Sequence, residues 1–301
     1  MGKILVTGGT IFVSRYAAEY FVQKGHEVYV LNRNSKPQSI GVHLIEADRR
    51  CLGNCLKSIH FDAVIDVTAY TAEDVNLLLD ALGSYDDYCL ISSSAVYPEH
   101  QPQPFTEESI VGPNCHWGKY GTDKIKAEQV VLRRTRQGYI VRPPYLYGAM
   151  DNLYREAFVF ECALKDRPFY LPKEGEMKLQ FFHVRDLCRF IEILFEKRPE
   201  RQIYNVGNER ALTVKEWVDL CYKAAGKEAQ FISVPKEFDQ REYFSFYDYE
   251  YYLSVAEQQR LMGETMNIEE GLKEALDWYQ KNPSLVERKP YIEFIDSHLA
   301  H

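Results

Sequence analysis

The chain has 301 residues, of which 46% are hydrophobic and 27% are charged, and its formal net charge is −8. This composition is typical of a globular protein that is long enough for a full core and a second lobe. The acidic balance argues against a general nucleic-acid surface, and no apolar run approaches the roughly 20 residues that a membrane helix needs.

The first 31 residues predict a strand, a turn, a helix and a second strand. Lys3–Thr7 is a short apolar run that ends in Gly8-Gly9, and a helical pattern follows over Phe12–Lys24. After Gly25, the run His26–Leu31 predicts the next strand. This order is a βαβ unit, and such units form parallel sheets.

Strand and helix patterns continue to alternate up to Gly148. Further strands are predicted at Val42–Glu46, Ala63–Val67, Tyr88–Ser92 and Tyr139–Arg142, and helices at Ala72–Leu82 and Trp117–Arg136. We therefore expect an α/β fold in which residues 1–148 form a Rossmann-type, doubly wound parallel sheet that binds a dinucleotide.

The strict alternation fades after Gly148. Helical patterns are found at Leu153–Leu164, Val184–Glu196, Val214–Ala225 and Ile268–Tyr279, with short strands such as Gln202–Val206 between them. This half predicts a smaller, mixed α/β C-terminal lobe for the substrate over residues 149–182 and 207–301. The chain is expected to return to the main sheet near residues 183–206.

The turn after the first strand has the position of a dinucleotide-binding loop but an incomplete set of glycines. Gly8 suits the tight turn, whereas Ile11 stands where a glycine usually lets the backbone approach the pyrophosphate. Ser14 is small enough to pack at the third position, and Gly9 restores some conformational freedom. The predicted cofactor-binding residues of this loop are Gly8, Gly9, Thr10, Ile11 and Phe12. A tight structural turn without a ligand is the alternative.

The ends of the next two strands bear on the choice of cofactor. The second strand ends in Asn32-Arg33 and lacks the carboxylate that usually binds the ribose 2′-hydroxyl. Arg33 suits a 2′-phosphate, which slightly favours NADP over NAD, although it is also typical of a solvated surface residue. Asp48, after the third strand, is expected either to accept a hydrogen bond from adenine or to cap a helix.

Tyr120 and Lys124 form the candidate catalytic pair. They are four residues apart and share a face of the predicted helix, where a lysine ammonium lowers the pKa of a neighbouring phenol. A tyrosine with a lowered pKa takes a proton from a hydroxyl group and returns it. Tyr20 and Lys24 have the same spacing, but they lie in mid-helix, away from the strand ends where ligands of doubly wound sheets bind.

Ordered motifs along nearly the whole chain resemble the extended short-chain dehydrogenase/reductases, and in particular the NAD-dependent epimerase/dehydratase family. They are Thr7-Gly8-Gly9-Thr10, Ser92-Ser93-Ser94-Ala95-Val96-Tyr97, Tyr120-Gly121-Thr122-Asp123-Lys124, the segment from Arg142 to Gly148, Phe182–Leu187, Tyr204–Asn208, and Gly271-Leu272 through Trp278-Tyr279. Motifs in this order are highly specific for the fold and less specific for the reaction.

The resemblance implies a role for each matching residue. Tyr120 corresponds to the catalytic acid/base, and Lys124 to the residue that holds the nicotinamide ribose and lowers the pKa of the tyrosine. Ser93, or Ser94 in its place, corresponds to the hydroxyl that bonds the reacting oxygen. The implied cofactor is NAD or NADP, whose positive nicotinamide would add to the pKa shift of Tyr120.

The expected reaction is that of a nucleotide-sugar epimerase. Dehydratases of the family carry an Asp-Glu pair at the positions of Ser94 and Ala95, so the residues found here argue against dehydration. A 4-keto-sugar or carbonyl reductase needs the same residues as an epimerase and remains the alternative. We favour the epimerase because the carboxyl half resembles a sugar-nucleotide lobe, in which Asn152 and Arg241 are expected diphosphate contacts.

A different class of protein shares the Gly-Gly-Thr-x-Phe loop, namely chloroplast RNA-binding proteins that look like degenerate relatives. This chain keeps Ser93, Tyr120 and Lys124 and is acidic, which favours an enzyme with a small-molecule substrate. Seven cysteines without a zinc-binding pattern indicate reduced thiols, a cytoplasmic location and no metal site. Neither a membrane nor a nucleic acid is an expected partner, and a homodimer is left open.

Two further features have no expected catalytic role. Residues 243–252 include seven aromatic side chains, which predicts a lobe core or an oligomer surface, with a ligand-stacking wall as the alternative. His183 and Asp186 lie where the chain returns from the lobe to the sheet. His183 is expected to make structural hydrogen bonds rather than to act as a base.

Overall fold

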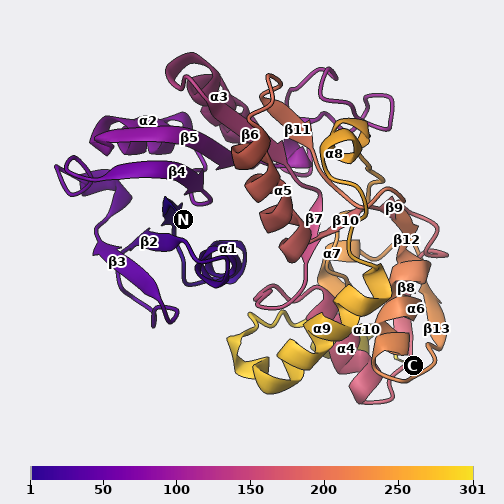
Figure 1. The fold of residues 1–301 in the computed structure, drawn as a ribbon. Helices are drawn as coiled ribbons and strands as arrows, with labels where there is room; N and C mark the ends of the chain where they lie inside the picture. Colours follow the sequence, from indigo (N-terminus) through magenta and orange to yellow (C-terminus); the bar gives the residue numbers. More distant parts are fainter. Residues whose placement is uncertain (1, 301) are drawn as a thin grey trace.

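Seven parallel strands form one central sheet. In the computed structural model, which describes residues 2–300, their spatial order is β11-β6-β5-β4-β1-β2-β3 (Figure 1). The strands are β1 (Lys3–Thr7), β2 (Glu27–Asn32), β3 (Val42–Glu46), β4 (His60–Asp66), β5 (Ser84–Ile91), β6 (Gly138–Arg142) and β11 (Ile203–Asn205). The strand order changes direction between β1 and β4, and ligands of such sheets bind at the carboxyl ends of the strands beside this switch point.

Helices cover both faces of the sheet. On one face lie α1 (Phe12–Gln23) and α5 (Val184–Lys197), and on the other lie α2 (Ala72–Ala81) and α3 (Lys119–Arg134). Alternate residues of β1 serve the two layers, because Ile4 packs with the α1 side and Leu5 with the α2 side. The predicted doubly wound α/β fold is confirmed. None of the helices in the described part of the chain has the length and apolar character needed to cross a membrane.

The carboxyl half adds short strands and helices around a core rich in aromatic residues. The strands are β7 (Tyr145–Tyr147), β8 (Phe169–Pro172), β9 (Lys178–Leu179), β10 (Phe181–His183), β12 (Leu212–Thr213) and β13 (Phe231–Val234), paired as β7 with β10, β8 with β13 and β9 with β12. The helices are α4 (Glu156–Leu164), α6 (Val214–Ala224), α7 (Gln240–Tyr243), α8 (Ala256–Leu261), α9 (Ile268–Lys281) and α10 (Tyr291–His298). Most of this half forms the lobe beside the sheet in Figure 1. Its apolar cluster also contains Val96 and Phe105 from the amino half, so the domain boundary at residue 148 stays a prediction.

The aromatic segment 243–252 belongs largely to this core. Tyr243, Phe244, Phe246 and Tyr251 are each at most 2% exposed. The ring of Phe246 packs edge-on against that of Trp217, with 5.1 Å between the ring centroids. The prediction of a lobe core is therefore confirmed for these four residues.

Several elements begin at other residues than their patterns predict, among them β4, which starts at His60 rather than at Ala63. β5 starts at Ser84, four residues before Tyr88, because Asp87 is buried in the strand as the partner of Arg198, whose Nη2 lies 2.7 Å from Asp87 Oδ2. α4 starts at Glu156 rather than at Leu153. The stretch before it is a turn, in which Asp151 Oδ1 accepts a hydrogen bond from Leu153 N at 2.9 Å.

A buried ion pair joins α3 to β6 behind the carboxyl edge of the sheet. Arg142 donates from Nε to Glu128 Oε1 (2.9 Å) and from Nη2 to Glu128 Oε2 (2.6 Å), and both residues are 3% exposed. Ser92 Oγ donates to Glu128 at 2.5 Å, and Arg142 also donates to Tyr97 Oη at 2.8 Å. Tyr97 donates in turn to Asn205 Oδ1 at 2.8 Å. This chain of hydrogen bonds links α3, β6 and β11 to the segment after β5.

Glu128→Ala is expected to lower the free energy of unfolding by about 3 kcal/mol or more, because Arg142 would remain buried without its partner. Chemical denaturation measures this change. Lys126→Ala on the same helix is the matched control, since it removes an exposed ion pair with Asp123 and should cost less than about 1 kcal/mol. Equal losses in the two variants would contradict a structural role for the buried pair.

Candidate active site

A cavity of about 480 Å³ opens at the carboxyl edge of the sheet. The amino half supplies the start of α1, the segments after β4, β5 and β6, and the first turns of α3. The carboxyl half supplies Leu153, Arg155, Tyr247 and Tyr251. The predicted catalytic residues that line the cavity are Ser93, Tyr120 and Lys124, together with Ser94. These residues come from separate parts of the chain, and the fold brings them to one surface.

Tyr120 lies in the first turn of α3 and is 37% exposed at the cavity wall. Close packing around the phenol nevertheless raises its pKa, while a hydrogen bond with Ser93 and the positive charge of Arg155 act to lower it. The net direction is opposite to the lowered pKa that the sequence predicts. Ser93 Oγ also accepts a hydrogen bond from Ala95 N at 3.1 Å, which fixes the hydroxyl at the start of a 3₁₀ turn.

Lys124 is 2% exposed and is anchored to the ends of two neighbouring strands. Its Nζ donates to Ala69 O at 2.7 Å, just after β4, and to Ile91 O at 2.8 Å, at the end of β5. The same atom lies 5.1 Å from the ring centroid of Tyr70 and 5.9 Å from that of Tyr120. Burial lowers the pKa of Lys124 to about 8. Because an ammonium has three N–H groups, one remains for a partner in the cavity.

Gly8 and Gly9 turn the chain from β1 into α1. Their φ angles are +93° and +92°, in the region that favours glycine. A Cβ atom on Gly9 would lie 2.5 Å from Val30 Cγ1, so the turn has no room for a side chain there. This bare turn at the start of a helix fits the pyrophosphate of a dinucleotide, and the remaining N–H of Lys124 fits a ribose hydroxyl.

Ile11 precedes α1 in an extended conformation and is 38% exposed. With Thr10 and Phe12 it lines a cavity of about 230 Å³ at the turn. Phe12 also lines the 480 Å³ cavity, so the two cavities share a wall at this residue. The branched side chain of Ile11 therefore stands at the surface of the turn and is not part of the core.

The three residues predicted at the strand ends have different surroundings. Asn32 Nδ2 donates to Gly8 O at 2.7 Å and ties the end of β2 to the glycine turn. Arg33 is exposed. The carboxylate of Asp48 accepts a hydrogen bond from Arg50 N at 2.9 Å and caps the 3₁₀ turn Arg49–Cys51, which is one of its two predicted roles.

Arg155 is a cation of the site that sequence reasoning missed. Its guanidinium carbon lies 4.9 Å from the ring centroid of Tyr145, an arrangement typical of a cation–π contact. Arg155 lines the 480 Å³ cavity and also a neighbouring cavity of about 150 Å³, to which Arg241 and Lys289 contribute. It follows a turn and belongs to no motif, so nothing in one sequence distinguishes it from the other arginines.

Aromatic side chains form part of the wall of the 480 Å³ cavity. Trp117 packs edge-on against Tyr247, with ring centroids 4.9 Å apart, and its Nε1 donates to Tyr249 Oη. Tyr145 and Tyr251 line the same cavity, with their ring centroids 5.3 Å apart. The segment 243–252 thus contributes to the cavity wall as well as to the lobe core.

The two predicted diphosphate contacts are not brought together. Arg241 Nη1 donates to Phe244 O at 3.2 Å, and its guanidinium carbon lies 4.7 Å from the ring centroid of Tyr247. Asn152 lines the cavity at the glycine turn instead, where its Nδ2 donates to Glu287 Oε1 at 3.0 Å. Only Arg241 lies beside the catalytic cavity.

Three other residues considered from the sequence have structural partners. Tyr20 Oη donates to Glu192 at 2.5 Å between α1 and α5, and Tyr20 does not line the 480 Å³ cavity. His183 is fully buried and caps α5 by accepting a hydrogen bond from Arg185 N at 3.2 Å, and burial lowers its pKa to about 3. Asp186 accepts a hydrogen bond from Met266 N at 2.5 Å. The expected structural role of His183 is confirmed.

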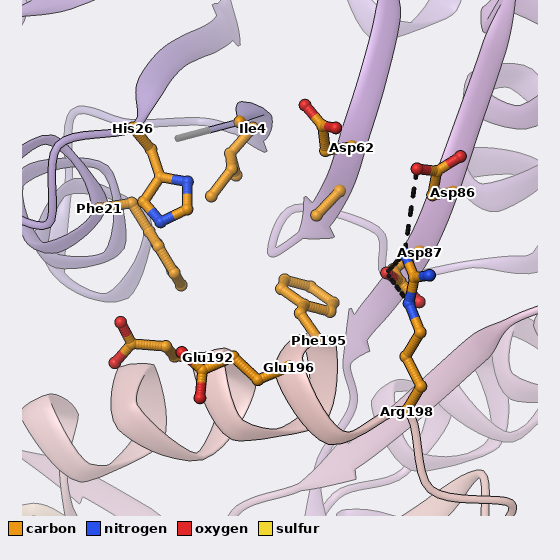
Figure 2. Close-up of a pocket in the computed structure, with 12 residues that line it drawn as sticks. Ile4, Phe21, His26, Asp62, Asp86, Asp87, Glu192, Phe195, Glu196 and Arg198 are labelled. Atoms are coloured by element: carbon orange, nitrogen blue, oxygen red, sulfur yellow. Dashed lines mark hydrogen bonds and ion pairs between the residues drawn. The ribbon is translucent and has the colours of Figure 1, made fainter.

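A separate cavity of about 260 Å³ lies at the amino edge of the sheet, among the side chains in Figure 2. Phe21 and Phe195 provide apolar surface, and the carboxylates that line it are Asp62, Asp86, Asp87, Glu192 and Glu196. Asp62 and Asp86, together with His60, bring one potential ligand atom each to within 4.8 Å of one another, and all three are exposed. None of the predicted catalytic residues lines this cavity.

A doubly wound sheet with Ser93, Tyr120 and Lys124 on one cavity at its carboxyl edge defines an extended short-chain dehydrogenase/reductase, a class of NAD(P)-dependent enzymes. The model of the NAD dependent epimerase/dehydratase family matches residues 4–207, more than half of the chain. The protein belongs to this family.

Its relatives include proteins with several activities. The chloroplast stem-loop binding protein of 41 kDa b from Arabidopsis thaliana is 29% identical over 286 residues, which cover 87% of this chain and 74% of that protein. The 2′-dehydrokanamycin reductase of Streptomyces kanamyceticus is 24% identical over 78% of this chain and 70% of its own length. The crystal structure of UDP-glucuronic acid 4-epimerase from Bacillus cereus, in complex with UDP-glucuronic acid and NAD, has a TM-score of 0.72 at 18% identity, covering 93% of this chain and 99% of that one. This structural similarity shows the fold alone.

Ile11→Gly is expected to tighten dinucleotide binding by a factor of about 3 to 10, because it removes an exposed branched side chain from the approach to the glycine turn. Calorimetric titration with NADH and NADPH measures the change. Gly9→Ala is the opposing variant, and it should weaken binding because its Cβ would collide with Val30. Weaker binding by Ile11→Gly would show instead that Ile11 supports the turn.

Proposed function

We propose that the protein is an NAD(P)-dependent nucleotide-sugar epimerase, which oxidises and re-reduces a carbinol carbon such as C4 of the sugar. The observation that carries this proposal is the single cavity lined by Ser93, Tyr120, Lys124 and Arg155. Three groups suited to proton exchange at a hydroxyl lie there beside a cation suited to an anionic substrate.

In this mechanism Tyr120 takes the proton of the substrate hydroxyl and later returns it, while Ser93 holds the same oxygen by a hydrogen bond. A bound nicotinamide supplies the site that accepts the hydride and gives it back. Lys124 is positively charged below its pKa of about 8 and favours the phenolate of Tyr120 during oxidation. Because packing raises the pKa of Tyr120, its protonated form is the resting form and is ready to donate a proton.

The cofactor would lie between the glycine turn and Lys124. Gly8 and Gly9 would hold the pyrophosphate through backbone N–H groups at the start of α1, and Lys124 would hold the nicotinamide ribose. The exposed Arg33, at the end of β2, slightly favours NADP over NAD because an arginine suits a 2′-phosphate. Titration with both dinucleotides distinguishes the two.

The anionic part of the substrate would lie toward the carboxyl lobe. Arg155, Arg241 and Lys289 line the 150 Å³ cavity, and Arg155 joins it to the catalytic cavity. No carboxylate among the described residues lines either cavity, so these cations would act on a diphosphate without competition there. Trp117 and Tyr247 offer flat apolar faces against which a sugar or a base can pack.

A keto-sugar or carbonyl reductase is the second candidate. The raised pKa of Tyr120 favours it, since a protonated phenol donates directly to a carbonyl oxygen. The similarity to a reductase of Streptomyces kanamyceticus supports it as well. Tightly bound, non-exchanging NAD in the purified protein would favour the epimerase, and exchangeable NADPH would favour the reductase. Ser94 and Ala95, at the positions of the dehydratase carboxyl groups, argue against dehydration.

A role without turnover is the alternative of another class, because one relative is a stem-loop binding protein. The acidic net charge of −8 and the cavity with Ser93, Tyr120 and Lys124 argue against it. Failure of the protein to bind any dinucleotide, together with binding of RNA hairpins, would support this alternative instead.

Tyr120→Phe is expected to lower kcat by a factor of about 10² to 10⁴ while dinucleotide affinity is kept, because only the proton-exchanging hydroxyl is lost. The measurement is product formation from a panel of UDP- and dTDP-sugars with NAD and NADP. Tyr20→Phe is the matched control, since Tyr20 has the same spacing to a lysine but lies away from the cavity. Activity close to wild type in Tyr120→Phe would overturn the assignment.

The rate should also fall as the pH rises through about 8, because Lys124 then loses the positive charge that favours the phenolate of Tyr120. A pH profile of kcat measures this alkaline limb. In Lys124→Arg the side chain stays charged, so any remaining activity should keep its rate to higher pH. The same alkaline limb in wild type and Lys124→Arg would assign the titration to another group.

A further inference from the structure

Two buried carboxyl groups face each other at the two ends of the loop that carries Arg155. Asp151 and Glu156 are each 3% exposed, and each acts on the pKa of the other. Glu156 Oε1 accepts a hydrogen bond from Gly148 N at 3.2 Å, and Asp151 Oδ1 accepts one from Leu153 N at 2.9 Å. Within residues 2–300, no N–H or O–H group donates a hydrogen bond to the other two oxygens, Asp151 Oδ2 and Glu156 Oε2.

A proton on this pair satisfies both of these oxygens. Two adjacent buried carboxylates repel each other strongly, and burial disfavours the charge on each. Burial raises the pKa of Asp151 to about 7 and that of Glu156 well above its usual range. The pair therefore holds at least one proton at neutral pH, and its two groups titrate together.

Arg155 is the charged group that acts on both carboxyls. Its positive charge acts to lower the pKa of each. Three other titratable groups around the pair are neutral near pH 7, namely Tyr147 of β7, Cys221 of α6 and His183 at the start of α5. Burial raises the pKa values of Tyr147 and Cys221 and lowers that of His183. The carboxylate of Asp186 also acts on Tyr147, and it is paired with Arg189 at 2.7 Å. A negative charge that the pair gains therefore attracts Arg155, whose positive charge acts on both carboxyls.

We propose that Asp151 and Glu156 are positioning residues, whose protonated state leaves Arg155 free to bind the anionic group of the substrate and whose ionisation weakens that binding. The proposal rests on the proposed function in one respect only, that the substrate carries an anion at Arg155. Arg155 stands between the two residues in the chain and lines both cavities of the site, so one guanidinium serves the carboxyl pair and the ligand. By linkage, the proton on the pair and the anion beside Arg155 favour each other.

Calorimetric titration of the full chain with sulfate, at constant ionic strength and between about pH 5.5 and pH 7.5, tests this coupling below the range in which Lys124 of the same cavity loses its charge. Sulfate carries the same charge over this range, so changes in affinity report on the protein. Wild type should bind sulfate about fivefold more weakly at the alkaline end. Arg155→Ala should lose the binding.

The variants identify the titrating groups. Glu156→Gln keeps the acceptor for Gly148 N and imitates a protonated carboxyl, so its sulfate affinity should not vary with pH. Asp151→Asn should behave in the same way and provides the same test if Glu156→Gln does not fold. Glu161→Gln is the matched control, because Glu161 is a buried carboxylate on the same helix that is paired with Lys165 and Arg288, and it should keep the pH dependence of wild type.

Protein stability gives a readout that needs no ligand. The folded pKa of Asp151 is raised from 3.8 to about 7, so the native state binds more protons than the unfolded chain between these values. The contribution of Asp151 to the free energy of unfolding is therefore fully present at low pH and is lost as the pH rises toward about 7. Glu156→Gln and Asp151→Asn should each flatten this fall in denaturation experiments, and Glu161→Gln should not.

The results of these experiments distinguish a failure of the positioning role from a failure of the proposed epimerase reaction. Three results would overturn the positioning role of Asp151 and Glu156. They are no sulfate binding, a wild-type sulfate affinity that does not vary with pH, and a sulfate affinity that still varies with pH in Glu156→Gln and Asp151→Asn. If the sulfate and stability results are as expected but no nucleotide sugar is turned over, the proposed epimerase activity is wrong and the positioning role is kept.

Discussion

The ammonium group of Lys124 is the interaction on which the carboxyl edge of the sheet depends. A buried cation is costly unless it is hydrogen-bonded, and Lys124 donates two of its three N–H groups to Ala69 O and Ile91 O, at the ends of two neighbouring strands. These bonds fix the position of α3 along the carboxyl ends of β4 and β5. The first turn of α3 then places Tyr120 at the wall of the cavity that Ser93 also lines, so the position of the candidate acid/base depends on how this buried charge is bonded.

Much of the sheet and the pair Tyr120 and Lys124 could be predicted because their signals are local, namely apolar runs, glycine turns and a four-residue spacing. The start of β5 could not. Asp87 lies within that strand only because Arg198, 111 residues away, pairs with it, and no local pattern contains that partner. Arg155 was missed for a similar reason, since its place in the cavity comes from a turn stabilised by tertiary contacts. The direction of the pKa shift of Tyr120 also depends on packing density, which spacing does not encode.

Charge is distributed unevenly over the molecule. The net charge is −8, yet among the described residues no carboxylate lines the cavities that contain Arg155 and Arg241, whereas five line the cavity at the amino edge. Such a distribution draws small anions toward the cavities that contain Arg155 and Arg241 and away from the one lined by five carboxylates. Overall composition therefore says more about long polyanions, which contact a wide surface, than about ligands that fit a single cavity.

The aromatic segment 243–252 serves the core and the cavity with the same side chains. Tyr251 is 2% exposed, packs against Tyr145 and still lines the 480 Å³ cavity, and Tyr247 lines that cavity from the same segment. A substitution that reshapes this wall also removes packing from the lobe. Changes of substrate preference during evolution would therefore carry a loss of stability if they used the wall. Substitutions of Arg155, Arg241 or Lys289, which are more exposed, could change the preferred substrate without removing packing from the core.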